Sequence, residues 1–425
     1  MSGTASSGTA SGMVVLYHRP LGKGAATITE HVESFGNYSR FRVWSINTEF
    51  GFPAMLRELP CEVIVLHYSL FGIWPYVLND FLRWMASSRA YKVAFFQDEH
   101  RFCAKRFEFL NVNRVDAVYS CLELEDAKQV YGPRTTVKNL RHTIPGYVSN
   151  ELMAVAQRMT VPDEQRTLDI AYRGRQLAYY MGRGGQEKYF IGVETQKRAA
   201  AAGLTVDIDS TENSRLYGEA WYHFMANARG TLGVESGVSI FDVDDIVRPA
   251  CDRYLVKHPN ASFEEVSDAV LAPWENNIPY RTISPRHFEA AALRVCQILF
   301  EGRYSGIMQP MVHYIPLKKD FSNWDEVVER FSDASLRRRL TSRAYDDLIA
   351  SGRYTYKQFV QGFDDDLISV GRVPGAARMG THDPIQSNLN GSWTGHCRAM
   401  ALWALRRPFP GRTRAVRLVR WLSGV

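Results

Sequence analysis

The chain has 425 residues, of which 45% are hydrophobic and 23% charged. This composition excludes disordered, fibrous and membrane-embedded classes, and the length is typical of two domains. The net charge of +6 is unevenly placed, because residues 371–425 hold nine arginines and one acid (+8), which leaves −2 for residues 1–370. The body is therefore not a basic nucleic-acid-binding surface, and we expect no nucleic-acid partner.

Targeting and redox features favour a cytoplasmic protein. Residues 1–12 are rich in Ser, Gly, Thr and Ala without the apolar core of a signal peptide, so they are interpreted as a flexible leader. The six cysteines show neither CxxC spacing nor a Cys/His cluster, which excludes a zinc site and a disulfide framework. The most apolar stretch, Val63–Leu78, is too interrupted to span a bilayer.

Residues 13–150 alternate short apolar runs with segments of helical periodicity. The expected strands are Met13–Tyr17, Phe41–Ile46, Val63–Leu66, Val93–Phe96, Ala117–Ser120 and Val137–Leu140, and the clearest helices are Pro75–Ala86, His100–Leu110 and Leu122–Tyr131. Strand and helix in alternation predict a parallel, doubly wound α/β sheet.

A second series of the same kind occupies residues 151–370. After a connecting helix at Glu151–Arg158, strands are expected at Leu168–Ala171, Thr205–Ile208 and Gly230–Val234, and helices at Gln186–Ala201, Leu216–Ala228, Phe263–Val270, His287–Leu299, Trp324–Phe331, Ser335–Ile349 and Tyr356–Ile368. The sequence thus predicts two Rossmann-like lobes facing a cleft, followed by a basic amphipathic tail at residues 371–425.

Several short patterns resemble cofactor or metal sites. Gly22-Lys23-Gly24 lacks the last glycine of a dinucleotide fingerprint and is interpreted as a turn. Asp207-Ile208-Asp209 and Asp242-Val243-Asp244 have the spacing of paired metal ligands, but such pairs are common by chance. We predict no metal site and no tightly bound cofactor.

Cations follow the first strand of the second lobe. Arg173 and Arg175 come directly after it, and Lys188 follows a glycine-rich segment. Cations beyond a strand's carboxyl end suit a diphosphate, and a solvated basic loop is the alternative. Ser236, Gly237 and Ser239 close a later strand, where they form either ligand contacts or a tight turn.

A helix start is marked by Ser284 and Pro285. One interpretation is a capped core helix. The other is that its free N–H groups and Arg286 bind a phosphate while Glu289 accepts hydrogen bonds from sugar hydroxyls.

Titratable residues also follow two strands of the first lobe. Asp98 and Glu99 lie in the segment Gln97–His100, and His67 follows Val63–Leu66. Each is a candidate general base toward an acceptor hydroxyl, although a structural role is favoured for His67.

Two segments carry a family resemblance. Pro285-Arg286-His287-Phe288-Glu289-Ala290-Ala291-Ala292, preceded by Thr231–Ser239, resembles the group 1 glycosyltransferases of the GT-B fold, in particular bacterial polysaccharide-cluster members. The resemblance implies that Glu289 binds the ribose of a nucleotide-sugar co-substrate such as a UDP- or GDP-sugar. The family's other acid, eight positions earlier, is Arg281 here. This departure puts a retaining mechanism in doubt, with Glu235 as a candidate substitute.

We therefore expect a metal-independent glycosyltransferase that moves a sugar from a nucleotide-sugar to a polysaccharide, lipid-linked or other hydroxyl acceptor. A sugar-nucleotide epimerase and a non-catalytic scaffold of the same fold are the alternatives.

The basic tail contains two apolar and arginine-rich stretches, Cys397–Arg407 and Thr413–Leu422. Their composition is that of an interfacial helix on anionic lipid at the inner face of the membrane. Packing of the tail on the protein body is the alternative.

Overall fold

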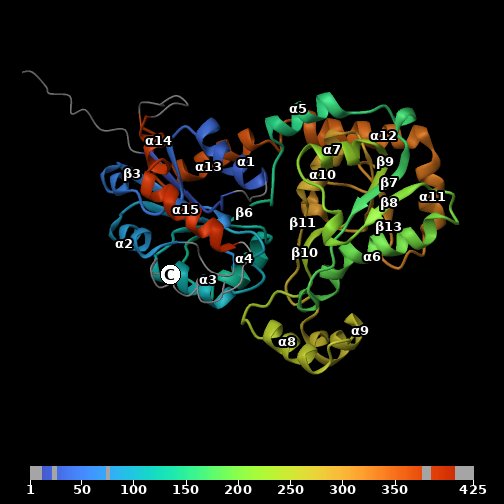
Figure 1. Ribbon diagram of the computed structural model, residues 1–425, viewed down its shortest axis with the longest axis horizontal. Coiled ribbons are helices and arrows are strands. Elements are labelled where there is room, and N and C mark those ends of the chain that lie inside the picture. Colours follow the sequence, from blue (N-terminus) through green and yellow to red (C-terminus); the bar gives the residue numbers. More distant parts are fainter. Residues whose placement is uncertain (1–11, 22–25, 73–76, 376–383, 407–425) are drawn as a thin grey trace, which may run out of the picture.

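The computed structural model describes residues 12–21, 26–72, 77–375 and 384–406, which form two lobes side by side (Figure 1). The first lobe holds a six-stranded parallel sheet in the order β2-β1-β3-β4-β5-β6. Its strands are β1 (Gly12–Tyr17), β2 (Arg42–Asn47), β3 (Cys61–Leu66), β4 (Tyr91–Phe95), β5 (Ala117–Ser120) and β6 (Asn139–His142), and its helices are α1 (Ala26–Tyr38), α2 (Asn79–Ser87), α3 (Cys103–Val112) and α4 (Leu124–Tyr131). The predicted doubly wound sheet is confirmed.

Helix α5 (Asn150–Met159) leads into the second lobe, whose five-stranded parallel sheet has the order β13-β12-β9-β7-β8. Its strands are β7 (Leu168–Arg173), β8 (Val206–Asp209), β9 (Ala228–Gly233), β12 (Cys296–Phe300) and β13 (Ile315–Leu317), and its helices are α6 (Gly182–Ala199), α7 (Glu219–Ala226), α10 (Pro285–Ala292), α11 (Trp324–Ser332) and α12 (Ala334–Tyr345). Ile170, Leu232 and Ile298 are buried in its core. The predicted fold class is confirmed for both lobes.

One predicted helix was wrong in its second half. We expected a helix over His287–Leu299, but α10 ends at Ala292 and the chain then enters β12. Arg294 adopts a positive φ of 53° between the two elements. The apolar run in β12 is buried on both faces, and such a run has no periodicity that separates strand from helix.

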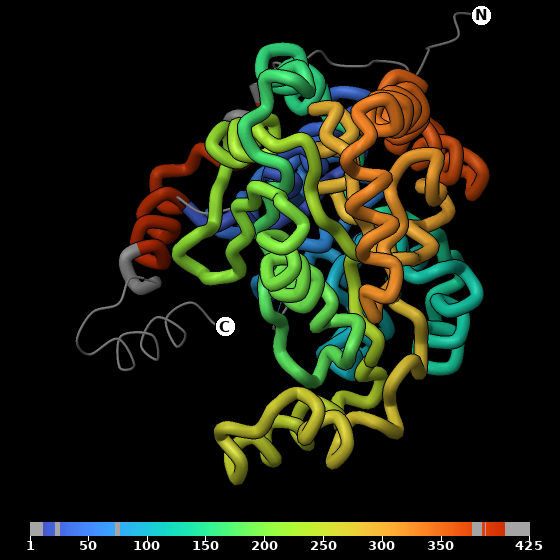
Figure 2. The backbone as a smooth tube through the Cα atoms, turned by 90° about the vertical axis from the view of Figure 1, so that its right-hand side faces the viewer, coloured from blue at the N-terminus to red at the C-terminus, as the bar shows by residue number. Residues whose placement is uncertain are grey.

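A helical insertion joins the antiparallel strands β10 (Ser236–Val238) and β11 (Tyr280–Thr282). It contains α8 (Val247–Lys257) and α9 (Phe263–Val266) and projects from the second lobe, in yellow in Figures 1 and 2. Near its start, ahead of α8, the Asp245 carboxylate accepts hydrogen bonds from the backbone N–H groups of Cys103 (3.0 Å) and Ala104 (2.9 Å). The root of the insertion therefore caps α3 of the opposite lobe.

The last described helices return to the first lobe. Tyr356 begins α13 (Tyr356–Ser369), which packs on α1 and buries Val360 and Phe363 against the first sheet. Helices α14 (Pro384–Asn390) and α15 (Trp393–Arg406) follow it there, shown in red in Figure 1. Our predicted second lobe ran to residue 370, whereas the chain from Tyr356 onward lies on the first lobe.

The chain passes between the lobes twice, near Val148 and near residues 354–356, and the two passages lie next to each other. The Val148 N–H donates to the Tyr354 carbonyl (2.8 Å), and the Tyr356 N–H donates to the Val148 carbonyl (3.1 Å). The predicted leader, the Gly22–Gly24 turn and the tail segment Thr413–Leu422 lie outside the described residues. Within the described ranges, no helix is both long and apolar enough to cross a bilayer.

Candidate functional site

A cavity of about 400 Å³ lies between the lobes, beyond the carboxyl ends of β7 and β9. In a parallel α/β sheet this is where ligands bind. Its walls include several predicted site residues: Asp98 from the first lobe, and Arg173, Arg175, Lys188, Ser236, Gly237, Ser284 and Arg286 from the second. The structure thus gathers most of the predicted cationic residues around one space.

Lys188 extends from α6, and its Nζ lies 3.4 Å from the Ser236 Oγ. Burial lowers the pKa of Lys188 to about 8, and the nearby Arg286, Arg281 and Arg175 contribute to the lowering, while Asp98 opposes it. Among the described residues that line the cavity, Asp98 is the one carboxylate. The cavity is therefore strongly electropositive and suited to an anionic group.

Arg286 lies at the start of α10. Its guanidinium stacks on the Trp221 ring at 4.8 Å and donates to the Arg173 carbonyl at 2.5 Å. Ser284 caps the helix, because its Oγ accepts the Arg286 N–H at 3.4 Å. The cation and the helix N-terminus are thus held at the same point of the cavity wall.

Arg173 and Asp207 form a bidentate ion pair. The guanidinium donates to both Asp207 carboxylate oxygens, at 2.7 and 3.1 Å, and lies 4.0 Å from the Phe224 ring. Arg173 therefore reaches the cavity wall with most of its donors engaged. The first Asp-x-Asp pair is explained by this contact, and in the second pair Asp242 accepts the N–H groups at the start of α8.

Glu289 lies behind the cavity wall. Its carboxylate accepts a hydrogen bond from the Trp221 indole N–H at 2.8 Å, and burial raises its pKa. Trp221, which lines the cavity, therefore separates Glu289 from the space itself in this structure.

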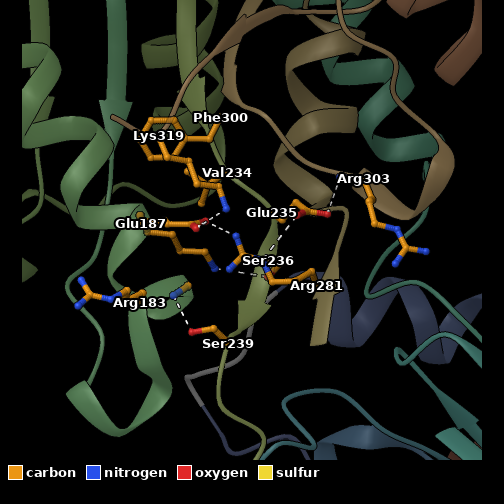
Figure 3. A network of polar contacts seen from close by, with 12 residues as sticks. Arg183, Glu187, Val234, Glu235, Ser236, Ser239, Arg281, Phe300, Arg303 and Lys319 are labelled. Atoms are coloured by element: carbon orange, nitrogen blue, oxygen red, sulfur yellow. Dashed lines mark hydrogen bonds and ion pairs between the residues drawn. The ribbon is translucent and has the colours of Figure 1, made fainter. Parts of the chain in front are cut away.

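Figure 3 shows the network around Arg281, the arginine at the position of the family's other acid. Its guanidinium binds Glu187 and lies 3.5 Å from Glu235. Glu235 also accepts the backbone N–H groups of Arg303 (3.1 Å) and Tyr304 (2.8 Å). The interpretation of Glu235 as a sugar-contacting acid is corrected: these bonds hold it outside the cavity.

The prediction that Ser239 contacts the ligand is corrected in the same way. Its Oγ accepts the Gly184 N–H at 2.8 Å, so it caps the start of α6 (Figure 3). It does not line the cavity, in contrast to Ser236 and Gly237, three and two residues earlier.

Two candidate bases of the first lobe are also structural. Glu99 is fully buried and accepts hydrogen bonds from Tyr131, from the Ser120 hydroxyl (2.9 Å) and from the Cys121 N–H (2.9 Å). Burial raises its pKa. His67 is fully buried, accepts the Ser69 N–H at 3.1 Å and lies 3.9 Å from the Tyr68 ring. Neither lines the cavity.

The structure adds residues that were not among the candidate site residues, although His100 belongs to the segment Gln97–His100 in which candidate bases were sought. His100 and Arg101 of the first lobe line the cavity with Asp98, and Trp221 of α7 lines it from the second lobe. His100 belongs to the same post-strand segment as Asp98, which was a usable signal. Trp221 lies in a helix with no local motif, so its position depends on the tertiary fold.

No protein-family model and no curated protein sequence matches the chain. Solved structures do. An alpha-glucosyltransferase in complex with UDP and a 13-mer DNA superposes with a TM-score of 0.51 at 11% identity, over 84% of this chain and 99% of that one. The DNA-modifying beta-glucosyltransferase (0.48, 12%, 84% and 99%) and sucrose-phosphate synthase from Thermosynechococcus elongatus (0.46, 9%, 85% and 99%) score lower. Two parallel α/β lobes, an interlobe cavity and this superposition together show that the chain has the GT-B fold.

Proposed function

We propose that the protein is a glycosyltransferase that binds a nucleotide-sugar in the interlobe cavity and transfers the sugar to a hydroxyl of a polysaccharide or lipid-linked acceptor. The observation that carries this proposal is the convergence of Lys188, Arg286 and the α10 N-terminus at the carboxyl end of the second sheet. Such a cluster suits the diphosphate of a sugar donor.

The proposed chemistry follows from where charge develops. When the bond between the sugar and the phosphate breaks, the leaving phosphate oxygen gains negative charge. Lys188 and Arg286 are already positioned at the cavity wall, so they stabilise that charge without reorganisation. We propose that these cations suffice and that transfer requires no divalent metal.

The donor test starts from UDP, because structures similar to this one were solved with UDP and with UDP-glucose. Thermal shifts are measured with UDP- and GDP-sugars on the wild type, on Arg286→Ala, and on Arg338→Ala, an exposed arginine of α12 outside the cavity. A shift that Arg286→Ala loses and Arg338→Ala keeps supports the proposal. No shift with any donor refutes it, and conversion of the donor without an acceptor indicates an epimerase.

Acceptors are screened with the bound donor. The polysaccharide and lipid-linked classes come first, and duplex DNA is included because the similar alpha-glucosyltransferase was solved with DNA. Sugar transfer to DNA alone would replace the proposed acceptor class.

Donor affinity is expected to fall as the pH rises through about 8. The charged form of Lys188 binds the diphosphate, and its pKa in the free protein is about 8, so the charged fraction decreases from pH 7 to 9. Bound phosphate favours the charged form, so the dissociation constant increases up to about tenfold per pH unit above 8. Calorimetric titration of UDP between pH 6.5 and 9.5 measures this, and Lys188→Met should remove the slope.

We also propose that the C-terminal region binds anionic membranes. Trp393 (80% exposed) and Met400 (61% exposed) lie with the exposed Cys397 on one face of α15, at helical spacing. Five arginines and no acid follow in residues 407–425. An apolar face that is followed in the sequence by this excess of positive charge suits an anionic lipid surface.

A chain ending at Arg406 is expected to lose at least about tenfold in binding to anionic vesicles, since each arginine contributes roughly 1 kcal/mol near such a surface. In the chain ending at Arg406, Trp393→Ser should weaken vesicle binding further. Val256→Ser, at an 83% exposed position of α8, should leave it unchanged. Co-sedimentation with phosphatidylserine and phosphatidylcholine vesicles measures both. Equal sedimentation of the full and shortened chains would contradict the proposal.

A further inference from the structure

His100 is a buried histidine in the cavity wall with both ring nitrogens unpartnered. Its side chain is 3% exposed, and neither Nδ1 nor Nε2 has a hydrogen-bond partner among the described residues. Leaving a buried polar group unpaired is unfavourable, because the group loses its hydration without gaining a partner. Because His100 also lines the cavity, its ring nitrogens are available to pair with a bound ligand.

The backbone around His100 is held in place from both lobes. The His100 carbonyl accepts the Asp242 N–H at 2.9 Å, which ties this segment to the second lobe. Asp98, two residues earlier, adopts a left-handed φ of 51°, a conformation that non-glycine residues rarely take. The ring centre lies 5.8 Å from that of Tyr280, and both Asp98 and His100 line the cavity.

The other cavity groups that could take a proton are accounted for. The His287 ring nitrogens face the Gln297 Oε1 (2.9 Å) and the Val234 carbonyl (3.3 Å). Glu235 and Glu187 are bound to Arg281, outside the cavity. Asp98 and His100 therefore remain as proton acceptors in the described cavity wall.

The charged groups that face His100 are Asp98, Arg101 and Arg106 of its own lobe and Lys188 of the second. Burial lowers the pKa of His100 to about 4, the cations contribute to the lowering, and Asp98 opposes it. The imidazole is therefore neutral at pH 7, with a lone pair available. Asp98 is the neighbour that stabilises the ring once it is protonated.

We propose that His100 is the general base of the transfer, with Asp98 as its counter-ion. The acceptor oxygen attacks the anomeric carbon, its proton passes to a ring nitrogen of His100, and the bond to the donor phosphate breaks with its electron pair on the phosphate oxygen. The base lies in the first lobe and the phosphate-binding cations lie in the second. Attack from the side opposite the leaving group inverts the anomeric configuration. This inference depends on the proposed glycosyl transfer and adds its base and stereochemistry.

The test uses the full chain and the donor that gives the largest thermal shift, with water and methanol as acceptors. Nucleoside diphosphate release gives kcat and KM, and proton NMR at early times gives the anomer of the product. His100→Gln is expected to lower kcat by about 10²–10⁴ with an unchanged donor shift. His258→Gln, at an exposed histidine of the insertion, is expected to keep full activity.

Two further readouts separate a base from a merely structural residue. Added imidazole is expected to restore part of the turnover of His100→Ala, and Asp98→Asn is expected to reduce kcat more than it changes KM. A product with the donor's anomeric configuration would overturn the inference, as would a His100→Gln variant with wild-type kcat or without donor binding. In each of these cases the wild type still binds donor, so the proposed function stands; absence of wild-type binding refutes that function instead.

Discussion

Gly237→Ala is expected to abolish donor binding and to destabilise the second lobe. Gly237 pairs with Arg281 in the β10–β11 ladder and has a φ of +110°, which side-chain-bearing residues rarely adopt. A Cβ at this position would lie 1.9 Å from the Tyr280 carbonyl oxygen, a backbone atom. The two strands must then separate, and the displaced β10 carries Ser236 out of the cavity wall. We expect at least a 100-fold loss of UDP affinity by calorimetry.

Gly203→Ala is the matched control for this change. Gly203 also has a positive φ, of +67°, but its Cβ would meet no atom within 4 Å. It therefore isolates the backbone strain, about 1–2 kcal/mol, from the steric clash. Donor affinity should be unchanged in Gly203→Ala. Equal affinity in Gly237→Ala would show that the ladder does not shape the cavity.

Glu99→Ala is expected to lower the free energy of unfolding of the first lobe by about 3–5 kcal/mol. The buried carboxylate pairs with Ser120, Cys121 and Tyr131, and it lies near the buried Arg106. Its removal leaves these donors and one cation without compensation in a region that water does not reach. Urea unfolding followed by circular dichroism measures the change in the transition that reports the first lobe.

Glu108→Ala, at an exposed position of α3, is the control and should change stability by less than about 0.5 kcal/mol. The same experiment distinguishes the role of Glu99 from that of its neighbour His100. Substitution of Glu99 is expected to lower stability, whereas substitution of His100 is expected to lower turnover. A Glu99→Ala protein with unchanged stability and reduced kcat would show that Glu99 is again a candidate general base.

The parallel sheets were predictable because their strands are short apolar runs between turns. Ala117–Ser120 was predicted with the observed bounds, and Val63–Leu66 lacks only the first two residues of β3. Prediction failed where tertiary contacts decide. The strand β12 was assigned to a helix, and α8 was missed because its apolar residues follow no clear helical stripe.

The candidate site likewise contains residues that could be predicted from the sequence and residues that could not. Residues that directly follow a strand, such as Asp98 and Arg175, reach the cavity because topology places all carboxyl ends at one edge. Sequence position could not tell which way neighbouring side chains point. Asp98 lines the cavity while the adjacent Glu99 is buried beneath it, and Ser236 lines it while Glu235 binds Arg281 on the other side.

The return of α13 to the first lobe has a consequence for the order of events during synthesis. The face of the first sheet around Phe35 and Phe95 is covered by Val360 and Phe363 of α13. These two residues are translated more than 200 residues after Tyr131, where the last of the first lobe's four early helices ends. At typical elongation rates this delay is roughly 10–40 s. The nascent first lobe therefore emerges from the ribosome with an aromatic surface uncovered, and it completes its core only after the entire second lobe has been made.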